Sequence, residues 1–256
     1  MEEGEGTSTA YRVARILVAL GSAAVPVLLL LVLVGAPQWF PGTPDCAVTT
    51  RDQPVELSTD EAQSAASAAA KSVRLGVPLR TASVAVAEVL DIPEQDGRNV
   101  ASALTGRSRH ALSCRHGGSD DEEPDRLDRS GLTGRAAALR GDLDRAFGSQ
   151  QVGGFAPGGV SSGHAPGSAH YEGRAVDFFF RPANKPNKTK GWAMAQYVVA
   201  HAERLEVETV IFDGRIWTAR RAGEGWRSYS PDTTGRSAEV AAVLEHRDHV
   251  HVDVAG

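Results

Sequence analysis

The stretch SAHYEGRAVDFFF, residues 168–180, decides the fold of the C-terminal half of the chain. Its second part, residues 175–180, is apolar apart from one acid and predicts a β-strand. Side chains alternate along a strand, so Ala175, Asp177 and Phe179 share one face. An ionised carboxylate inside such a strand is unfavourable unless a partner or a metal ion compensates its charge. Asp177 is therefore the first candidate for a functional residue.

A second stretch, EHRDHVHVDV at residues 245–254, has the same character. Valines alternate with polar residues over 249–254, which predicts a closing strand with His249 and His251 on one face, their Cα atoms about 6.6 Å apart. A lone histidine is usually a surface or core residue, but two on one face, with Glu245 upstream, indicate a site. His246, adjacent to Glu245, is expected to point elsewhere in either a helix or a strand. Imidazole and carboxylate are the ligands of a catalytic zinc, which keeps three protein ligands and one open position.

The elements around these two stretches predict an α+β domain over residues 134–256, built as a small antiparallel sheet with flanking helices. Glycines crowd the loop at 150–167, and Asp213-Gly214 predicts a turn inside the strand region 207–217. From the spacing of apolar residues we expect helices over 135–147, 192–205 and 238–244.

The N-terminal part differs, because the run Ile16–Val34 is apolar and carries no charge. At 1.5 Å of rise per residue it can cross the roughly 30 Å hydrocarbon core of a membrane. Arg12 and Arg15 precede it, so the positive-inside rule predicts a cytoplasmic tail over 1–15, a transmembrane helix over 16–34 and the remainder outside. The predicted location is the cell membrane, with a single pass. A cleaved signal peptide is the alternative, but the run ends without a clear small-x-small site.

Three segments are expected between this run and the C-terminal domain. Residues 35–57 predict a stalk, and residues 58–114 predict a small helical module that begins with a capping box of Ser58 and Glu61. Residues 115–133 are polar and acidic, which is typical of a solvated linker.

The two cysteines, Cys46 and Cys114, are not spaced like metal ligands. In an exported chain such a pair tends to oxidise, which predicts a disulfide between them. Two unrelated thiols are the alternative.

Residues 168–177 match at every position the S-x-H-x-x-G-x-A-x-D pattern of the LAS metallopeptidases, the superfamily of lysostaphin, D-Ala-D-Ala metallopeptidases and sonic hedgehog. Residues 245–251 are similar to the second signature of that superfamily, an acid followed by H-x-H on the last core strand. The resemblance covers residues 134–256 and implies the LAS/hedgehog-like zinc peptidase fold there. It implies Zn²⁺ ligands at His170, Asp177 and His251, a general base at Glu245 with Glu172 as the alternative, and oxyanion stabilisation by His249.

The resemblance further implies a zinc-dependent peptidoglycan peptidase, either a D,D-carboxypeptidase or an endopeptidase, that cleaves stem or cross-link peptides. D-Ala-D-Ala enzymes of this superfamily carry an arginine for the substrate carboxylate upstream of the first histidine, and residues 152–163 contain none. Either another arginine replaces it, or the substrate is not cut beside a free carboxylate. The candidates for that replacement are Arg215, Arg220 and Arg174. Substrate-binding candidates are Ser168, His164 and Arg215, with a turn-forming serine and a mobile loop histidine as alternatives for the first two.

The bulk properties exclude other classes of function. A net charge of −5 argues against a nucleic-acid partner, which would require a basic face. The chain has neither a Walker loop nor a dinucleotide fingerprint. The expected partners are peptidoglycan stem peptides, and the membrane through one helix. A zinc-bearing cell-wall binding or sensing module without turnover is the alternative function, and the sequence leaves the oligomeric state open.

Overall fold

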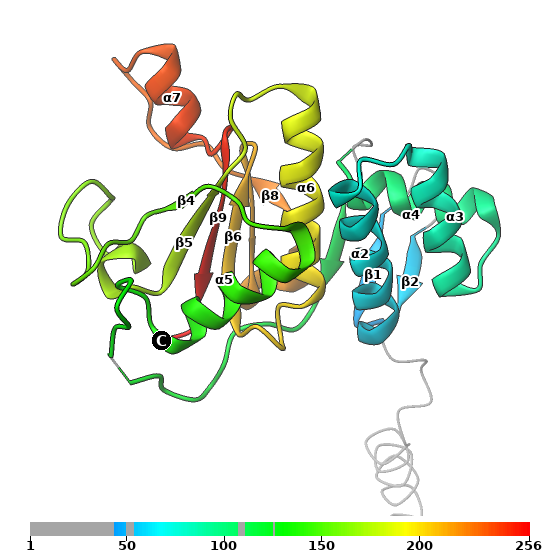
Figure 1. Cartoon of the computed structure of the whole chain (residues 1–256), viewed down its shortest axis with the longest axis horizontal. Helices are drawn as coiled ribbons and strands as arrows, with labels where there is room; N and C mark the ends of the chain where they lie inside the picture. Colours follow the sequence, from blue (N-terminus) through cyan, green and yellow to red (C-terminus); the bar gives the residue numbers. More distant parts are fainter. Residues whose placement is uncertain (1–43, 50–53, 107–110, 125) are drawn as a thin grey trace, which may run out of the picture. The chain divides into compact units, whose positions relative to one another are not determined.

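The computed structural model describes residues 44–49, 54–106, 111–124 and 126–256. Pro44–Gly256 forms one compact unit (Figure 1). Within the described part of the chain, no helix combines the length and the apolar character needed to cross a membrane. The predicted cytoplasmic tail at 1–15 and the predicted span at 16–34 lie outside the described residues.

A six-stranded antiparallel sheet forms the centre of the C-terminal half, in the order β4-β5-β9-β6-β7-β8. The strands are β4 (Val152–Gly153), β5 (Ala175–Phe179), β6 (Val207–Phe212), β7 (Arg215–Thr218), β8 (Arg227–Ser228) and β9 (His249–Val254). The last strand in the sequence, β9, lies between β5 and β6 (Figure 1). The two stretches at 168–180 and 245–254 therefore meet in the middle of the sheet.

One face of this sheet is apolar and packs against two helices. The helix α5 (Gly134–Phe147) contacts β5 and β9, and α6 (Lys185–Ala200) contacts β6 and β9. A Cβ at Gly191 of α6 would lie 2.2 Å from the ring of Phe212, so the helix approaches the sheet closely there. The alternating residues that fill this face are fully buried: Val176, Phe178, Val210, Phe212, Val250 and Val252.

The helix α6 begins and ends earlier than the sequence predicts, since it runs from Lys185 to Ala200 and the expected range was 192–205. Its N-cap is Asn184, whose side chain accepts a hydrogen bond from the Asn187 amide, and Pro186 occupies the first turn. Both are favourable signals for a helix start. The other predicted elements hold: α7 (Ala238–Leu244) has the expected bounds, and β6 turns into β7 at Asp213-Gly214.

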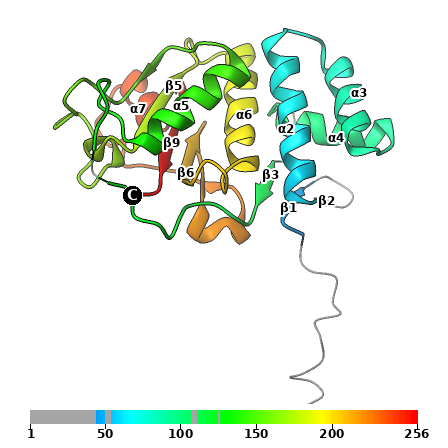
Figure 2. The ribbon, with the colours of Figure 1, turned by 60° about the horizontal axis from the view of Figure 1, so that its bottom comes forward.

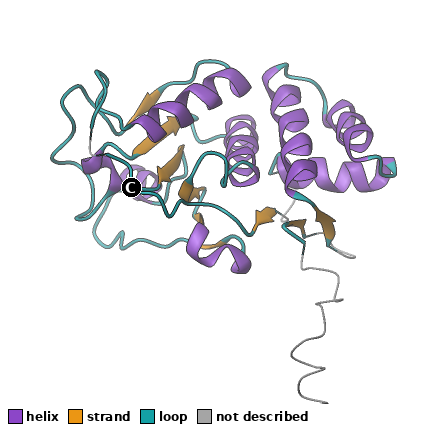
Figure 3. Cartoon of the chain, turned by 90° about the horizontal axis from the view of Figure 1, so that it is seen from below, coloured by secondary structure: helices purple, strands orange, loops and turns teal. Residues whose placement is uncertain are grey.

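In its described part, the segment expected to be a small helical module has three helices and one short strand. It contains α2 (Thr59–Arg74), α3 (Leu79–Leu90) and α4 (Glu94–Leu104), and β3 (Leu112–Cys114) pairs with β1 (Cys46–Val48), which also pairs with β2 (Val55–Leu57). Figure 3 shows these short strands apart from the larger sheet. The predicted capping box at the start of α2 is present. Helix α2 packs against α6 (Figure 2).

The predicted disulfide is confirmed. Cys46 and Cys114 are bonded and lie opposite each other in the pairing of β1 with β3. The bond joins residues 68 positions apart, so it connects β1 to β3, which follows the three helices.

The fold expected from the sequence is wrong in its sheets. The described chain has two antiparallel sheets, of three and six strands, where one small sheet was expected. In the smaller sheet, β3 pairs with the distant strand β1, and strands of three residues are too short to show an alternating pattern. The expected membrane-spanning helix at 16–34 lies outside the described residues. The α+β class itself holds.

Candidate metal centre

Antiparallel pairing of β5 with β9 brings the two sequence motifs together. Asp177 lies opposite His251, and Phe179 lies opposite His249. Directly opposed residues on antiparallel strands project from the same face of the sheet. The carboxylate and both imidazoles therefore leave the sheet on the face away from α5 and α6, and all three of these polar side chains are buried.

The 3₁₀ helix η1 (Ala169–Glu172) carries His170 to the same place. The Ser168 hydroxyl accepts a hydrogen bond from the His170 amide at 3.4 Å, and Gly173 ends the turn with φ 70. A Cβ at Gly173 would lie 2.7 Å from the Gly131 carbonyl oxygen, so this turn requires glycine. Ser168, a substrate-binding candidate from the sequence, thus caps the turn that holds His170.

Three potential ligand atoms converge on one point. His251 Nδ1 lies 3.0 Å from Asp177 Oδ1 and 3.1 Å from His170 Nε2. The third distance, from His170 Nε2 to Asp177 Oδ1, is 3.4 Å. Ligands placed tetrahedrally around zinc at 2.0–2.1 Å stand roughly 3.3 Å from one another. The three residues therefore have the composition and the spacing to hold a metal ion.

The charges around these atoms favour a bound cation. Burial would raise the pKa of Asp177, but hydrogen bonds from His170 and His251 hold it well below its usual range. Burial would lower the pKa of His251, yet the carboxylates of Asp253 and Asp177 raise it to about 10. Two buried carboxylates thus draw positive charge to this point. A divalent cation supplies that charge when the imidazoles give up their protons.

Residues outside the ligand set lie close to the ligand side chains. Asp253 Oδ1 lies 2.7 Å from His251 Nε2, within ion-pair distance, although it has no hydrogen-bond partner among the described residues. A carboxylate at this side of a metal-binding imidazole can support the ring electrostatically. His170 Nδ1 is buried without a hydrogen-bond partner among the described residues. A Cβ at Gly154, where φ is +84, would lie 2.1 Å from His170 Cε1 and 3.1 Å from Asp177 Oδ2. The glycine-rich loop at 150–167 therefore approaches His170 and Asp177 closely at a residue that has no side chain.

Two further predicted residues lie at the centre. His249 Nδ1 is 2.8 Å from Asp248 Oδ1, which fixes the ring, and His249 Nε2 is 3.8 Å from Asp177 Oδ1. The ring of His164 stacks on that of His170 with centroids 3.9 Å apart. The Tyr171 hydroxyl accepts from the His164 amide at 3.0 Å and contacts its carbonyl oxygen at 2.5 Å, so the loop is fastened here.

The two carboxylates proposed as bases point elsewhere. Glu245 Oε2 accepts a hydrogen bond from Arg247 Nε at 2.8 Å. Glu172 is paired in the same way with Arg174. Neither carboxylate lies within 4.0 Å of a histidine nitrogen in the described part of the chain.

Arg215 is not brought to the centre either. It lies opposite Phe212 in the β6–β7 pair, and Phe212 belongs to the face that packs on the helices. Its guanidinium donates to the carbonyl oxygen of Trp226 at 3.1 Å. The side chain therefore projects from the face opposite to that of the ligands.

His246, which was expected to point away from the centre, lies beside it. Its ring centroid is 4.5 Å from that of His249 and 5.4 Å from that of His251. Nδ1 is 2.9 Å from the Leu244 carbonyl oxygen and so carries the hydrogen, which leaves Nε2 as an acceptor. Burial and the neighbouring histidines lower the pKa of His246 to about 3. Asp253 was also missed, although its place in the alternating strand was a usable signal.

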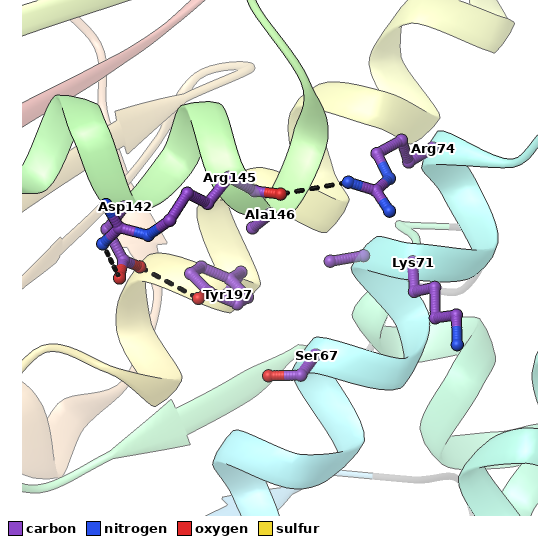
Figure 4. A pocket seen from close by; sticks show the side chains of 8 residues that line it. Ser67, Lys71, Arg74, Asp142, Arg145, Ala146 and Tyr197 are labelled. Carbon is purple, nitrogen blue, oxygen red and sulfur yellow. Dashed lines mark hydrogen bonds and ion pairs between the residues drawn. The ribbon is translucent and has the colours of Figure 1, made fainter.

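A separate pocket of about 270 Å³ lies between α2, α5 and α6 (Figure 4). Its acid, Asp142, accepts hydrogen bonds from the Tyr197 hydroxyl at 2.9 Å and from both terminal nitrogens of Arg204. The carboxylate is thus already neutralised, and this pocket is a seam between helices. It is lined by Ser67, Ala70, Lys71, Arg74, Asp142, Arg145, Ala146 and Tyr197.

Comparison with known families gives one similarity. A family model described as VldE, C-terminal domain, matches residues 128–240. The matched region includes His170 and Asp177 and ends before His251. Searches of curated proteins and of solved structures found no match. The chain is therefore similar over residues 128–240 to the C-terminal domain of VldE.

Proposed function

We propose that residues 134–256 form a zinc-dependent peptidase that cleaves peptidoglycan stem or cross-link peptides. The observation that supports this proposal is the convergence of His170 Nε2, Asp177 Oδ1 and His251 Nδ1 at 3.0–3.4 Å. A zinc ion held there would polarise a peptide carbonyl and supply a nucleophilic water at neutral pH. The substrate class rests on the resemblance of the two motifs to the LAS metallopeptidases.

Two histidines outside the ligand set would contribute to the reaction or line the site. His249 Nε2 faces the ligand cluster, and Nδ1 is held by the carboxylate of Asp248. The doubly protonated ring of His249 would therefore donate a hydrogen bond from Nε2 to the oxyanion of a tetrahedral intermediate. His164 lines the loop side of the cluster by stacking on His170. The disulfide between Cys46 and Cys114 supports a location outside the cytoplasm, because such bonds persist in oxidising compartments.

Two residues compete for the role of general base. Glu245 is the acid that the resemblance assigns, but its carboxylate is engaged with Arg247. His246 presents an unprotonated Nε2 beside His249 and His251. The contacts favour His246, although burial and the neighbouring histidines lower its pKa to about 3 and so weaken it as a base. It would take the proton of the attacking water and pass it to the leaving amine. A positioned base typically contributes 10²–10⁴-fold in rate.

The test is to incubate the zinc-loaded full chain with purified muropeptides and identify products by mass spectrometry. We expect cleavage of a peptide bond by the parent and a loss of at least about 100-fold in kcat for His246→Ala. Glu245→Gln, which can still accept a hydrogen bond from Arg247, should keep most of the activity. A large loss in Glu245→Gln with little change in His246→Ala would assign the base to Glu245.

The alternative function is a zinc-bearing module that binds or senses cell-wall fragments without cutting them. The pairing of both candidate carboxylates with arginines is the observation in its favour. Tight binding of muropeptides by the parent, with no product at any zinc concentration, would establish this alternative.

A further inference from the structure

Two residues with left-handed backbones meet beside the candidate metal centre: His246 with φ 54 and Asp213 with φ 49. His246 follows the C-cap of α7. Its amide donates to the Val243 carbonyl oxygen and the Arg247 amide donates to that of Ala242, both at 2.9 Å. This is a Schellman motif, in which glycine normally occupies the left-handed position. A histidine there indicates that its side chain is needed.

Core packing does not hold this end of α7 in place. None of the helix residues is buried, and its largest apolar side chains, Val240, Val243 and Leu244, are 36–44% exposed. The β6–β7 turn holds it through the backbone instead. The Asp213 amide donates to the His246 carbonyl oxygen at 2.7 Å, and the Gly214 amide donates to that of Glu245 at 2.9 Å.

Arg247 completes this contact with its guanidinium. Nη1 donates to the Asp213 carbonyl oxygen at 2.8 Å and to its Oδ1 at 3.2 Å, while Nε donates to Glu245 Oε2 at 2.8 Å. A Cβ at Gly214 would lie 2.9 Å from Cζ, Nη1 and Nη2, so the guanidinium lies against bare backbone. Lys188 Nζ, 2.6 Å from Asp213 Oδ1, connects the same carboxylate to α6.

These contacts end at the imidazole of His246. The backbone turn that they hold also sets the Leu244 carbonyl oxygen, which fixes the protonated nitrogen of the ring at Nδ1. The other side of the ring packs edge-on against Tyr229, with centroids 5.2 Å apart. The position and the tautomer of His246 are therefore both determined outside the ligand set.

We propose that Asp213 and Arg247 are positioning residues, which clamp the end of α7 and hold the imidazole of His246 against the metal centre. The inference rests on the proposed function for its catalytic consequence, but the clamp itself is a structural claim. It gives Glu245 a different role, as the partner of Arg247 within the clamp.

The first experiment is a long-range ¹H–¹⁵N spectrum of the zinc-loaded full chain with labelled histidines, which reports the tautomer of each ring. The chain has eight histidines, and His246→Ala identifies the signal of interest. We expect one His246 species, protonated at Nδ1, in the parent. In Arg247→Ala this signal should shift or split, whereas the signal of the distant His201 should stay unchanged. Arg221→Ala, which removes an exposed arginine paired with Glu224, is the matched control and should change neither signal.

The second experiment measures hydrolysis in a double-mutant cycle. We expect Arg247→Ala to lower kcat at least about tenfold with little change in KM, and to cause no further loss in a His246→Ala background. A role in general stability would instead lower activity by the same factor in both backgrounds. If Arg247→Ala does not fold, Arg247→Lys keeps the cation but not the forked geometry and should give the same changes in smaller degree.

An unchanged His246 signal in a folded Arg247→Ala or Arg247→Lys variant overturns the clamp. A parent that cleaves no muropeptide overturns the proposed function and leaves the spectrum to decide the clamp, so the two failures are distinguishable.

Discussion

Replacing Gly154 by alanine should destroy the metal site with little effect on the rest of the fold. Gly154 has φ +84, and a Cβ there would lie 2.1 Å from His170 Cε1 and 2.4 Å from its Nδ1. Carbon atoms in contact stand at about 3.5 Å, so the ring would have to retreat by roughly 1.4 Å. His170 is only 2% exposed, which leaves no room for that movement without disturbing its neighbours.

The magnitude follows from how little displacement a metal site tolerates. Ligand distances hold within about 0.2 Å, so a shift of roughly 1.4 Å removes His170 from the ligand set. We expect zinc affinity to fall at least about 100-fold, equivalent to about 2.8 kcal/mol. The left-handed backbone adds roughly 1–2 kcal/mol of destabilisation, because alanine has a Cβ that glycine lacks.

The matched control is Gly158→Ala. Gly158 lies in the same loop with φ +81, but a Cβ there would meet nothing within 4 Å. The control should therefore show the loss of stability in thermal unfolding without the loss of zinc affinity in competition with a chelator. Equal zinc affinity in the two variants would refute the assignment of His170 as a ligand held by this loop.

Three further outcomes are expected. Cys46→Ser should lower the free energy of unfolding by about 4 kcal/mol in denaturant titrations, because the disulfide closes a loop between residues 68 positions apart; equal stability of parent and variant would show that the bond does not constrain the unfolded chain. Asp142→Asn should lower it by roughly 2 kcal/mol at pH 7. Although burial opposes ionisation, hydrogen bonds from Arg204 and Tyr197 lower the pKa of Asp142 below its usual value of 3.8. The difference should therefore be complete above about pH 4, shrink as the pH falls through the lowered pKa and be absent once the parent is protonated; a difference independent of pH would refute the ionic contribution. Asp253→Asn should weaken zinc binding 10–100-fold, while the exposed Asp232→Asn should not; equal affinities would remove Asp253 as the support of His251.

Much of the central sheet was predictable because its signals are local. The alternation of valine with polar residues over 249–254 gives β9 its bounds and places His249, His251 and Asp253 on one face. The pairing register, which sets Asp177 opposite His251, is a long-range property that no local pattern contains. The resemblance to the LAS metallopeptidases implied that Asp177 and His251 share one site, but it did not predict the register.

The smaller sheet and α4 were not predictable for a physical reason. Each of the three strands has three residues, and their pairing depends on the long-range contact between Cys46 and Cys114. In α4, glycine and Asn99 lie inside the helix, and both have low helix propensity. Tertiary packing decides the structure there, since Val100 and Leu104 are buried in the core.

The acidic segment at 115–133 shows a similar limit. It was expected to be a solvated linker, but Glu123 Oε1 accepts a hydrogen bond from the Arg135 amide at 2.6 Å, at the start of α5. A Cβ at Gly117 would lie 2.8 Å from the ring of Trp217, so that part packs closely against β7. Composition indicates polarity, but it does not show which polar residues serve as caps.

The prediction for His246 was wrong because the backbone conformation decides where its side chain points. His246 was expected to point away because a regular helix or strand would turn it from the strand face of His249 and His251. Its left-handed φ of 54 at the end of α7 reverses that direction. Histidine is not the residue that signals such a turn, so no local pattern predicted it.

The most direct test of the zinc site is anomalous diffraction at the zinc absorption edge from crystals of the zinc-loaded protein. The structure predicts one peak per chain, within 2.0–2.2 Å of His170 Nε2, His251 Nδ1 and Asp177 Oδ1. A peak bound elsewhere, or none at these three atoms under saturating zinc, would contradict the account.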